Sequence, residues 1–184
     1  MKLRSGLRIA FSVVALLVAV VSANAGAGCW QAVTHYNRGL DLQVKGDLDG
    51  AITEYRTSIR QCPSFWRPVY NLGTLLQAKS DLDGAIAQYR TVISEWPKIW
   101  QAHLALGNIL EDRGDLEGAI VEYRAVIKRR KKDPEAHYHL GHALQAQGDL
   151  EAAIVEYRTA IRLRPNYAQA QSAIAEVLKS RGNP

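Results

Sequence analysis

The sequence contains little that could carry covalent chemistry. Only two of its 184 residues are cysteine, which excludes a small fold held together by many disulfides. It has no glycine-rich phosphate-binding loop, no Gly-x-Ser-x-Gly sequence and no His-Glu-x-x-His sequence. We therefore expect a protein that has no catalytic residues, needs no cofactor and is not an enzyme.

The chain also has little excess charge of one sign. Lys and Arg together number 23 and Asp and Glu together number 18, which gives a formal net charge of +5. Lys2, Arg4 and Arg8 supply three of these charges within a segment that we interpret below as a removable leader, so the remainder carries +2. Because nucleic-acid binding needs a strongly basic surface, we expect no nucleic-acid partner.

The apolar run Ile9–Val21 is too short to span a bilayer. It has 13 residues, whereas a spanning helix needs about 20. Three cations precede the run and the small residues Ala23-Asn24-Ala25 follow it, which is the layout of a secretory signal peptide. We expect residues 1–25 to be a signal peptide cleaved after Ala25, and the remaining chain to be periplasmic or secreted. The alternatives are a buried N-terminal helix and an uncleaved membrane anchor.

The rest of the sequence is an internal repeat with a period of 34 residues. Glycine recurs at this interval, and an alanine and a tyrosine follow each glycine after 12 and 16 residues. These positions are Gly39, Gly73, Gly107 and Gly141, then Ala51, Ala85, Ala119 and Ala153, then Tyr55, Tyr89, Tyr123 and Tyr157. Apolar residues around the alanine and tyrosine follow the spacing of one helical face, so each copy contains an amphipathic helix.

An aspartate precedes this helix in every copy, at Asp47, Asp81, Asp115 and Asp149. Aspartate is a favourable N-cap because its carboxylate accepts hydrogen bonds from free backbone N–H groups. Glycine stands before the aspartate in the first, third and fourth copies, and Ser80 in the second copy. This indicates a tight turn between two helices. We expect the repeated tyrosines to be core residues, packed beside the small glycine and alanine.

This pattern resembles the tetratricopeptide repeat family, whose 34-residue helix-turn-helix unit carries Leu-Gly, then Ala-x3-aromatic, then Pro. The resemblance covers four units, at residues 32–65, 66–99, 100–133 and 134–167. It implies an all-α fold, a right-handed α-solenoid, in which residues 26–31 are a short linker and 168–184 a capping helix and tail. In that last helix the apolar pattern continues at Ala168, Ile174, Ala175 and Leu178.

The two cysteines stand at the ends of the first predicted helix pair. Cys29 precedes the first helix and Cys62 ends the second, and antiparallel helices bring these two ends together. In an oxidising compartment we expect a Cys29–Cys62 disulfide. The alternatives are two buried free thiols and a lipidated Cys29, although Gly26 stands where a lipidation sequence needs a branched aliphatic residue.

Several histidines lie close together in the sequence without the spacing of a metal site. His139 and His142 share a helical face, whereas His137 lies about 200° from His139, and no cysteine or carboxylate completes a tetrahedral set. His35, His103 and His137 occupy equivalent repeat positions, where the family usually has an aromatic residue. We therefore expect a packing role for these histidines and no metal.

One dense cationic run lies at the end of the third amphipathic helix. It comprises Lys128, Arg129, Arg130, Lys131 and Lys132, with Lys131 in place of the closing proline of the repeat. Cations are favourable at helix C-termini, so the run is first interpreted as a solvated helix end. The alternative is a patch for an anionic lipid, an envelope polymer or an acidic partner.

The family resemblance implies a partner-binding groove lined by the first helix of each repeat. Its predicted residues combine amide groups, which pair with peptide backbones, with tyrosines, which bury large areas at low entropic cost. They are Tyr36, Asn37, Tyr70, Asn71, Thr74, Gln77, Asn108, Glu111, Tyr138, His139, His142 and Gln145.

We therefore expect a non-catalytic scaffold of the cell envelope that binds a protein or an extended peptide. The alternatives are a lipid- or polymer-binding module that uses residues 128–132, and an accessory subunit of an exported enzyme. Membrane contact is expected only through that basic run or an uncleaved leader. The uncapped first repeat could also mediate self-association.

Overall fold

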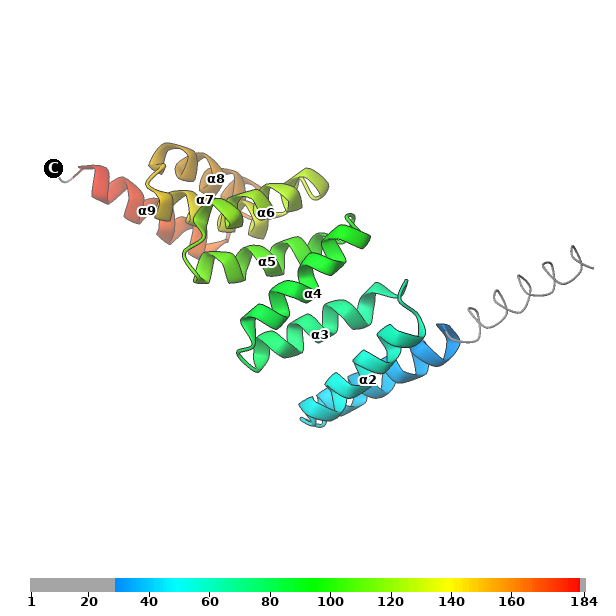
Figure 1. Ribbon diagram of the computed structural model, residues 1–184. Coiled ribbons are helices and arrows are strands. Elements are labelled where there is room, and N and C mark those ends of the chain that lie inside the picture. Colours follow the sequence, from blue (N-terminus) through cyan, green and yellow to red (C-terminus); the bar gives the residue numbers. More distant parts are fainter. Residues whose placement is uncertain (1–28, 183–184) are drawn as a thin grey trace, which may run out of the picture. The chain divides into compact units, whose positions relative to one another are not determined.

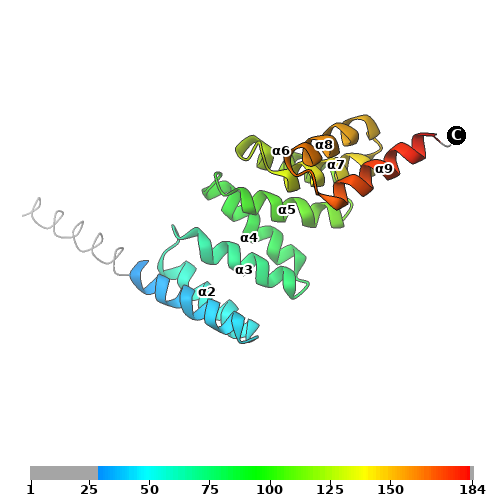
Figure 2. The same cartoon turned by 180° about the vertical axis from the view of Figure 1, so that it is seen from behind.

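The computed structural model describes residues 29–182 (Figures 1 and 2). The predicted signal peptide at 1–25 and the first residues of the predicted linker lie outside this range. Within it the regular secondary structure is entirely α-helical, as the repeat pattern predicts. These residues form two compact units, which are described separately below. Unit 1 ends at Lys79 and unit 2 begins at Ser80.

Unit 1 contains three helices. Residues 29–44 are helical, α2 is Leu48–Gln61 and α3 is Trp66–Ala78. The predicted linker is wrong at 29–31, which form part of the first helix, because neither glycine nor proline interrupts this stretch.

Unit 2 continues the helix pairs to the C-terminal end. Its helices are α4 Leu82–Glu95, α5 Trp100–Asp112, α6 Leu116–Arg129, α7 Pro134–Gln147, α8 Leu150–Leu163 and α9 Ala168–Gly182. Contacts join α5 to α6, α6 to α7 and α7 to α8, so successive helices pack on one another (Figure 1). Figure 2 shows α9 following α8 at the end of the chain.

The predicted N-caps are confirmed. Each aspartate side chain accepts a hydrogen bond from a backbone N–H three residues later, for example Asp115 from Gly118 at 3.0 Å. The preceding residue has a positive φ in every copy, 78° at Gly114 and 64° at Ser80. Ser80 therefore adopts a left-handed conformation that L-residues other than glycine rarely visit.

The third repeat has no closing proline, and the next proline in the sequence, Pro134, begins the following helix. Pro134 is the first residue of α7, where its missing N–H is not needed. Asp133 caps this helix through hydrogen bonds from the backbone N–H groups of Glu135 and Ala136. The departure from the repeat pattern at Lys131 thus leaves the helix order unchanged.

The repeated tyrosines are fully buried, as expected, and lie against the repeated glycines. Tyr123 has no exposed surface, and a Cβ on Gly107 would lie only 2.7 Å from its ring. Gly141 has the same relation to Tyr157 at 2.8 Å. Glycine at this place therefore lets the two helices of a pair approach around the tyrosine ring.

The buried face of α9 differs from the predicted one. Ala170 and Val177 are buried, whereas Ala168, Ala175 and Leu178 are exposed. The predicted stripe was therefore out of phase with the face that packs, because the contacts of α9 with α8 and Tyr167 are made by the side that carries Ala170.

Candidate functional site

The six predicted groove residues of unit 1 come from the first helix and α3. The Asn71 amide donates to the Tyr36 hydroxyl at 3.4 Å and to the Tyr55 hydroxyl at 3.5 Å. The Tyr36 ring packs on Tyr55 and Phe65, with centroids 5.9 and 5.1 Å apart. The structure therefore brings Tyr36 and Asn71 together over the buried Tyr55.

The other predicted residues of unit 1 differ in exposure. Asn37 is exposed, whereas Tyr70, Thr74 and Gln77 are partly buried. Burial raises the pKa of Tyr70 above its ordinary value, so its hydroxyl remains protonated at neutral pH. Thr74 donates to the backbone carbonyl of Asn71 at 2.8 Å, which occupies its hydroxyl proton within α3.

Glu111 of α5 is the centre of the predicted groove residues in unit 2. One of its carboxylate oxygens lies 2.6 Å from the Tyr123 hydroxyl and the other 2.5 Å from Nδ1 of His142. The Tyr123 hydroxyl also lies 2.9 Å from Oδ1 of Asn108. Three helices, α5, α6 and α7, thus fix these polar groups in one network.

This network raises the pKa of the Tyr123 hydroxyl well above its ordinary range. Burial is the largest cause, followed by the hydrogen bond to Glu111 and its negative charge. Tyr123 therefore acts as a hydrogen-bond donor at all physiological pH values and is not suited to acid–base catalysis.

His139 lies on the same surface, and the nitrogens of its imidazole are available for hydrogen bonds. Its ring stacks on Tyr123, with centroids 5.4 Å apart and planes inclined by 25°. Burial lowers its pKa, so the ring is neutral at pH 7. No hydrogen bond joins its nitrogens to the described part of the chain, which leaves a donor and an acceptor for a ligand.

A depression of about 400 Å³ opens beside this network between α7 and α9. Tyr138, His142 and Gln145 of α7 form one side, and α9 contributes Gln169, Ser172 and Glu176 among others. Gln145 accepts a hydrogen bond from the buried Tyr157 hydroxyl at 2.7 Å, which fixes its side chain. The α9 side of this depression was missed by the sequence analysis, which assigned the last helix only a capping role.

Most of the predicted groove residues are less exposed than expected. Of the twelve, only Asn37 and His142 are exposed, and the others are partly buried because they pack against one another and against the core tyrosines. Below we call Asn108, Glu111, Tyr138, His139, His142 and Gln145 the unit 2 polar surface.

The three equivalent histidines form hydrogen-bonded pairs with glutamates, which the sequence analysis missed. Each lies close to the glutamate 19 residues later, with Nδ1 to Oε2 distances of 2.5 to 2.6 Å. The pairs are His35–Glu54, His103–Glu122 and His137–Glu156. A signal was present, because the repeat with Val69 instead of histidine also has Gln88 instead of glutamate.

His137 should make the stability of unit 2 depend on pH. The hydrogen bond to Glu156 is the largest cause that raises its pKa, and burial partly opposes it. A raised folded-state pKa gives stability that is complete below the unfolded value of about 6.5 and is lost as the pH rises through the folded value.

We therefore expect the free energy of unfolding to fall above about pH 6.5, by about 1.4 kcal/mol for each tenfold difference in proton affinity between the two states. Urea denaturation over this pH range measures it. In Glu156→Gln this fall should shrink, because the hydrogen bond that raises the pKa of His137 is weakened. An unchanged pH profile in Glu156→Gln would contradict the assignment.

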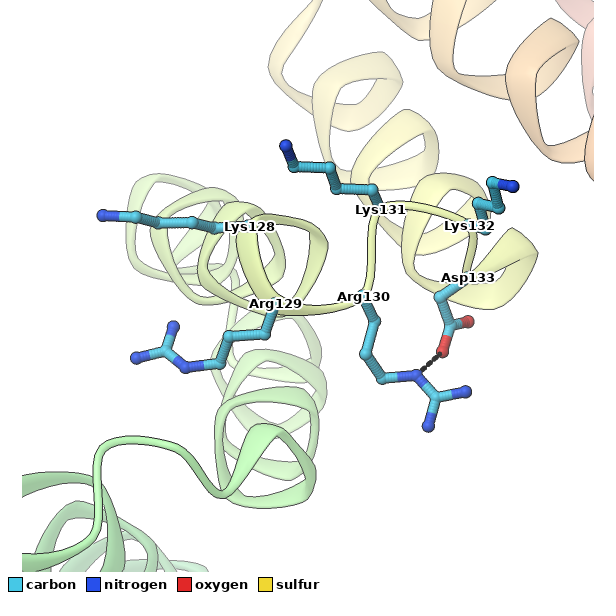
Figure 3. Close-up of a pocket in the computed structure, with 6 residues that line it drawn as sticks. All are labelled: Lys128, Arg129, Arg130, Lys131, Lys132 and Asp133. Atoms are coloured by element: carbon cyan, nitrogen blue, oxygen red, sulfur yellow. Dashed lines mark ion pairs between the residues drawn. The ribbon is translucent and has the colours of Figure 1, made fainter.

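The cationic run covers the last residues of α6 and the turn that follows, and its side chains diverge. Lys128, Arg129, Lys131 and Lys132 point in different directions around the turn after α6 (Figure 3). Arg130 pairs with Asp133 at 2.8 Å and lies 4.1 Å from the centroid of the Trp100 ring. Because the cations do not converge and one is already paired, the geometry does not form a compact anion site.

A disulfide joins Cys29 and Cys62, whose Cα atoms are 4.7 Å apart. It connects the start of the first helix to the C-cap of α2. The same two helices are also joined by the Ser58 hydroxyl, which donates to the Ala32 carbonyl at 2.7 Å. Both links hold the helix pair at one end.

Over residues 29–182, no group of three or more His, Cys, Asp or Glu side chains is placed to hold a metal ion. The histidines instead contact separate partners. His137 contacts Glu156, His139 stacks on the Tyr123 ring, and His142 contacts Glu111. In the same range, no helix is both long and apolar enough to cross a membrane.

Comparisons with known proteins match part of the chain to a repeat family and most of it to solved structures of one fold. A family model described as "TPR repeat" matches residues 107–148 and 143–182. No curated protein matches the sequence.

Solved structures resemble the chain over most of its length. A MamA structure from Desulfovibrio magneticus RS-1, starting at its residue 41, is 20% identical, with a TM-score of 0.77, and the match covers 83% of this chain and 86% of that one. A tetratricopeptide repeat protein from Parabacteroides merdae is 21% identical, with a TM-score of 0.77 and coverage of 83% and 60%. YrrB, described as a TPR protein with an unusual peptide-binding site, is 22% identical, with a TM-score of 0.68 and coverage of 77% and 73%.

At these identities the solved structures establish the fold alone. The predicted fold class is confirmed, since the described residues have the all-α helical-repeat fold of these proteins. Residues 107–182 match the TPR repeat family, and the same 34-residue pattern extends through the earlier repeats of the chain.

Proposed function

We propose that this protein is a non-catalytic scaffold that binds a protein or an extended peptide segment. The observation that carries this proposal is the network around Glu111, in which Tyr123 and His142 hold a carboxylate on the same surface as His139. The His139 ring stacks on Tyr123, and its nitrogens have no hydrogen bond within the described residues. Polar groups that are fixed before binding lose little entropy when a ligand arrives.

The chemistry of the unit 2 polar surface suits a peptide. Amide and imidazole groups on Asn108, Gln145 and His139 can pair with backbone N–H and C=O groups, and the Tyr138 ring offers apolar area. The depression between α7 and α9 gives this surface a concave part. The peptide-binding site named for YrrB supports the proposal at the level of a shared fold.

We further propose that the scaffold acts outside the cytoplasm. The proposal rests on the layout of residues 1–25 and on the Cys29–Cys62 disulfide, which an oxidising compartment would preserve. Intact-mass measurement of the exported protein should give a chain that begins at Gly26. A mass that includes Met1–Ala25 would contradict cleavage.

Photocrosslinking tests the binding surface. A photoreactive residue at Ser172, which lines the depression, should crosslink one partner protein in the producing cells, whereas the same residue at the exposed Lys98 between α4 and α5 should not. His142→Ala should lower the Ser172 crosslink at least about fivefold, which corresponds to about 1 kcal/mol of binding energy.

Gln147→Ala is the matched control, because Gln147 is exposed on the same helix but does not line the depression. It should leave the Ser172 crosslink unchanged. Equal crosslinking from Ser172 and Lys98, or an equal effect of the two alanine variants, would overturn the assignment of the surface.

A further inference from the structure

Two repeat positions hold the same residue in all four copies and are exposed in each of them. One is the aspartate that caps the second helix, and its capping hydrogen bonds explain why it recurs in every copy. The other is the arginine directly after the buried tyrosine, at Arg56, Arg90, Arg124 and Arg158. The structure gives this arginine no comparable role.

These arginines have no partner within the described part of the chain. No hydrogen bond, ion pair or ring contact joins Arg90, Arg124 or Arg158 to another residue at 29–180. By contrast, other cations of unit 2 are engaged, as Arg113 is with Asp83 at 2.6 Å. The repeated guanidinium groups are therefore available to a ligand.

The neighbouring exposed positions have diverged between the repeats. Three residues before the arginine, the four copies have Thr53, Ala87, Val121 and Val155. Four residues after it, they have Arg60, Ser94, Lys128 and Arg162. Shared ancestry of the repeats therefore does not preserve exposed residues in general, and the arginine has been retained where its neighbours changed.

In unit 2 the arginines share their face with apolar side chains. Val121 and Val155 lie one helical turn before Arg124 and Arg158, and they are 61% and 58% exposed. Arg90 and Val121 also line one depression with Ile93, and Asp115, Glu117 and Glu122 line its acidic side. The second helices of unit 2 thus present alternating cationic and apolar groups.

An acidic row limits what this face can accept. Asp83, Glu117 and Glu151 lie in the first turns of α4, α6 and α8, two helical turns before the arginines. A flat anionic membrane or a nucleic acid would meet these carboxylates as well as the arginines. Membrane-surface binding also relies on larger apolar side chains than valine. A narrow ligand can place its negative charges at the arginines and neutral side chains beside these carboxylates.

We propose that Arg90, Arg124 and Arg158, with Val121 and Val155, form a second binding surface that takes an acidic peptide segment with apolar side chains. Carboxylates of the peptide pair with the guanidinium groups, and its apolar side chains cover the valines. This surface lies on the second helices of the repeats and is separate from the unit 2 polar surface, which the first helices carry.

Fluorescence anisotropy with a defined probe tests the proposal. The probe is a labelled synthetic peptide in which Glu alternates with Val, and its neutral counterpart has Gln in place of Glu. The full-length protein should bind the Glu peptide and bind it more weakly at high salt. Replacing Arg90, Arg124 and Arg158 with Gln should weaken binding at least about tenfold.

The matched control removes the same charge from elsewhere in unit 2. Lys98→Gln, Lys131→Gln and Lys132→Gln together should leave the affinity nearly unchanged, because these exposed lysines lie outside the arginine row. Glutamine is also a good helix former, and circular dichroism checks that both triple variants fold.

Several results would overturn the proposal. Equal weakening by the two triple variants would show that only net charge matters, and equal binding of the Gln peptide would exclude charge pairing. Arginine-dependent binding to phosphatidylglycerol vesicles, without binding of the Glu peptide, would assign the surface to a membrane. His142→Ala should leave the peptide affinity unchanged, so this test is independent of the unit 2 polar surface.

Discussion

Replacing Tyr123 with alanine should lower the free energy of unfolding of unit 2 by about 3–5 kcal/mol, the cost of removing a large buried aromatic side chain. The ring has no exposed surface and fills the space left by Gly107 between α5 and α6. Its removal also takes one hydrogen-bond donor from Glu111 and the stacking surface from His139. Chemical denaturation followed by circular dichroism measures the change.

Tyr123→Phe separates packing from hydrogen bonding. It keeps the ring against Gly107 and removes only the hydroxyl, so we expect a loss of about 1–3 kcal/mol for the unpaired polar groups that remain. An alanine variant no less stable than the phenylalanine variant would show that the ring is not a core element. The comparison also tests the network itself, because Glu111 should then depend on His142 alone.

The helix order could be predicted because the repeat carries redundant local signals. The aspartate caps, the glycine turns and the buried tyrosines each mark the same boundaries, and four copies confirm one another. Helix starts depend on groups within one turn of the chain, so a sequence pattern contains most of the information needed.

The side-chain partners between helices were harder to predict. The pairing of His137 with Glu156 joins residues 19 apart on different helices, and neither residue alone indicates it. Only a comparison of repeats could do so, because Val69 and Gln88 change together. Burial of the groove residues also depended on the size of neighbouring rings, which a helical pattern does not contain.

The face of α9 shows where repetition gives no help. Within unit 2, α5 packs against α4 and α6, and α7 packs against α6 and α8, so the apolar positions of these first helices are set by the repeat. After α9 no further helix follows within the described residues, and the packing of Ala170 and Val177 alone decides the phase. The same lack of a following helix leaves α9 free to line the depression beside Tyr138 and His142.

Removing the Cys29–Cys62 disulfide should lower the free energy of unfolding of unit 1 by about 3–4 kcal/mol. The bond closes a loop with a sequence separation of 33, and the entropy that this closure removes from the unfolded chain sets the size of the effect. The double variant Cys29→Ser with Cys62→Ser avoids new disulfides between chains. Reduction of the wild-type protein should produce the same loss.

Hydrogen exchange distinguishes a local from a global effect. In the double variant, amide protection should fall in residues 29–44 and α2, where the bond and the Ser58–Ala32 hydrogen bond hold the two helices together. Protection in α5 to α8 should stay unchanged, since these helices contact one another and not the bond. If the unreduced exported protein has two alkylatable thiols, the bond is absent in solution and the first helix pair depends on packing alone.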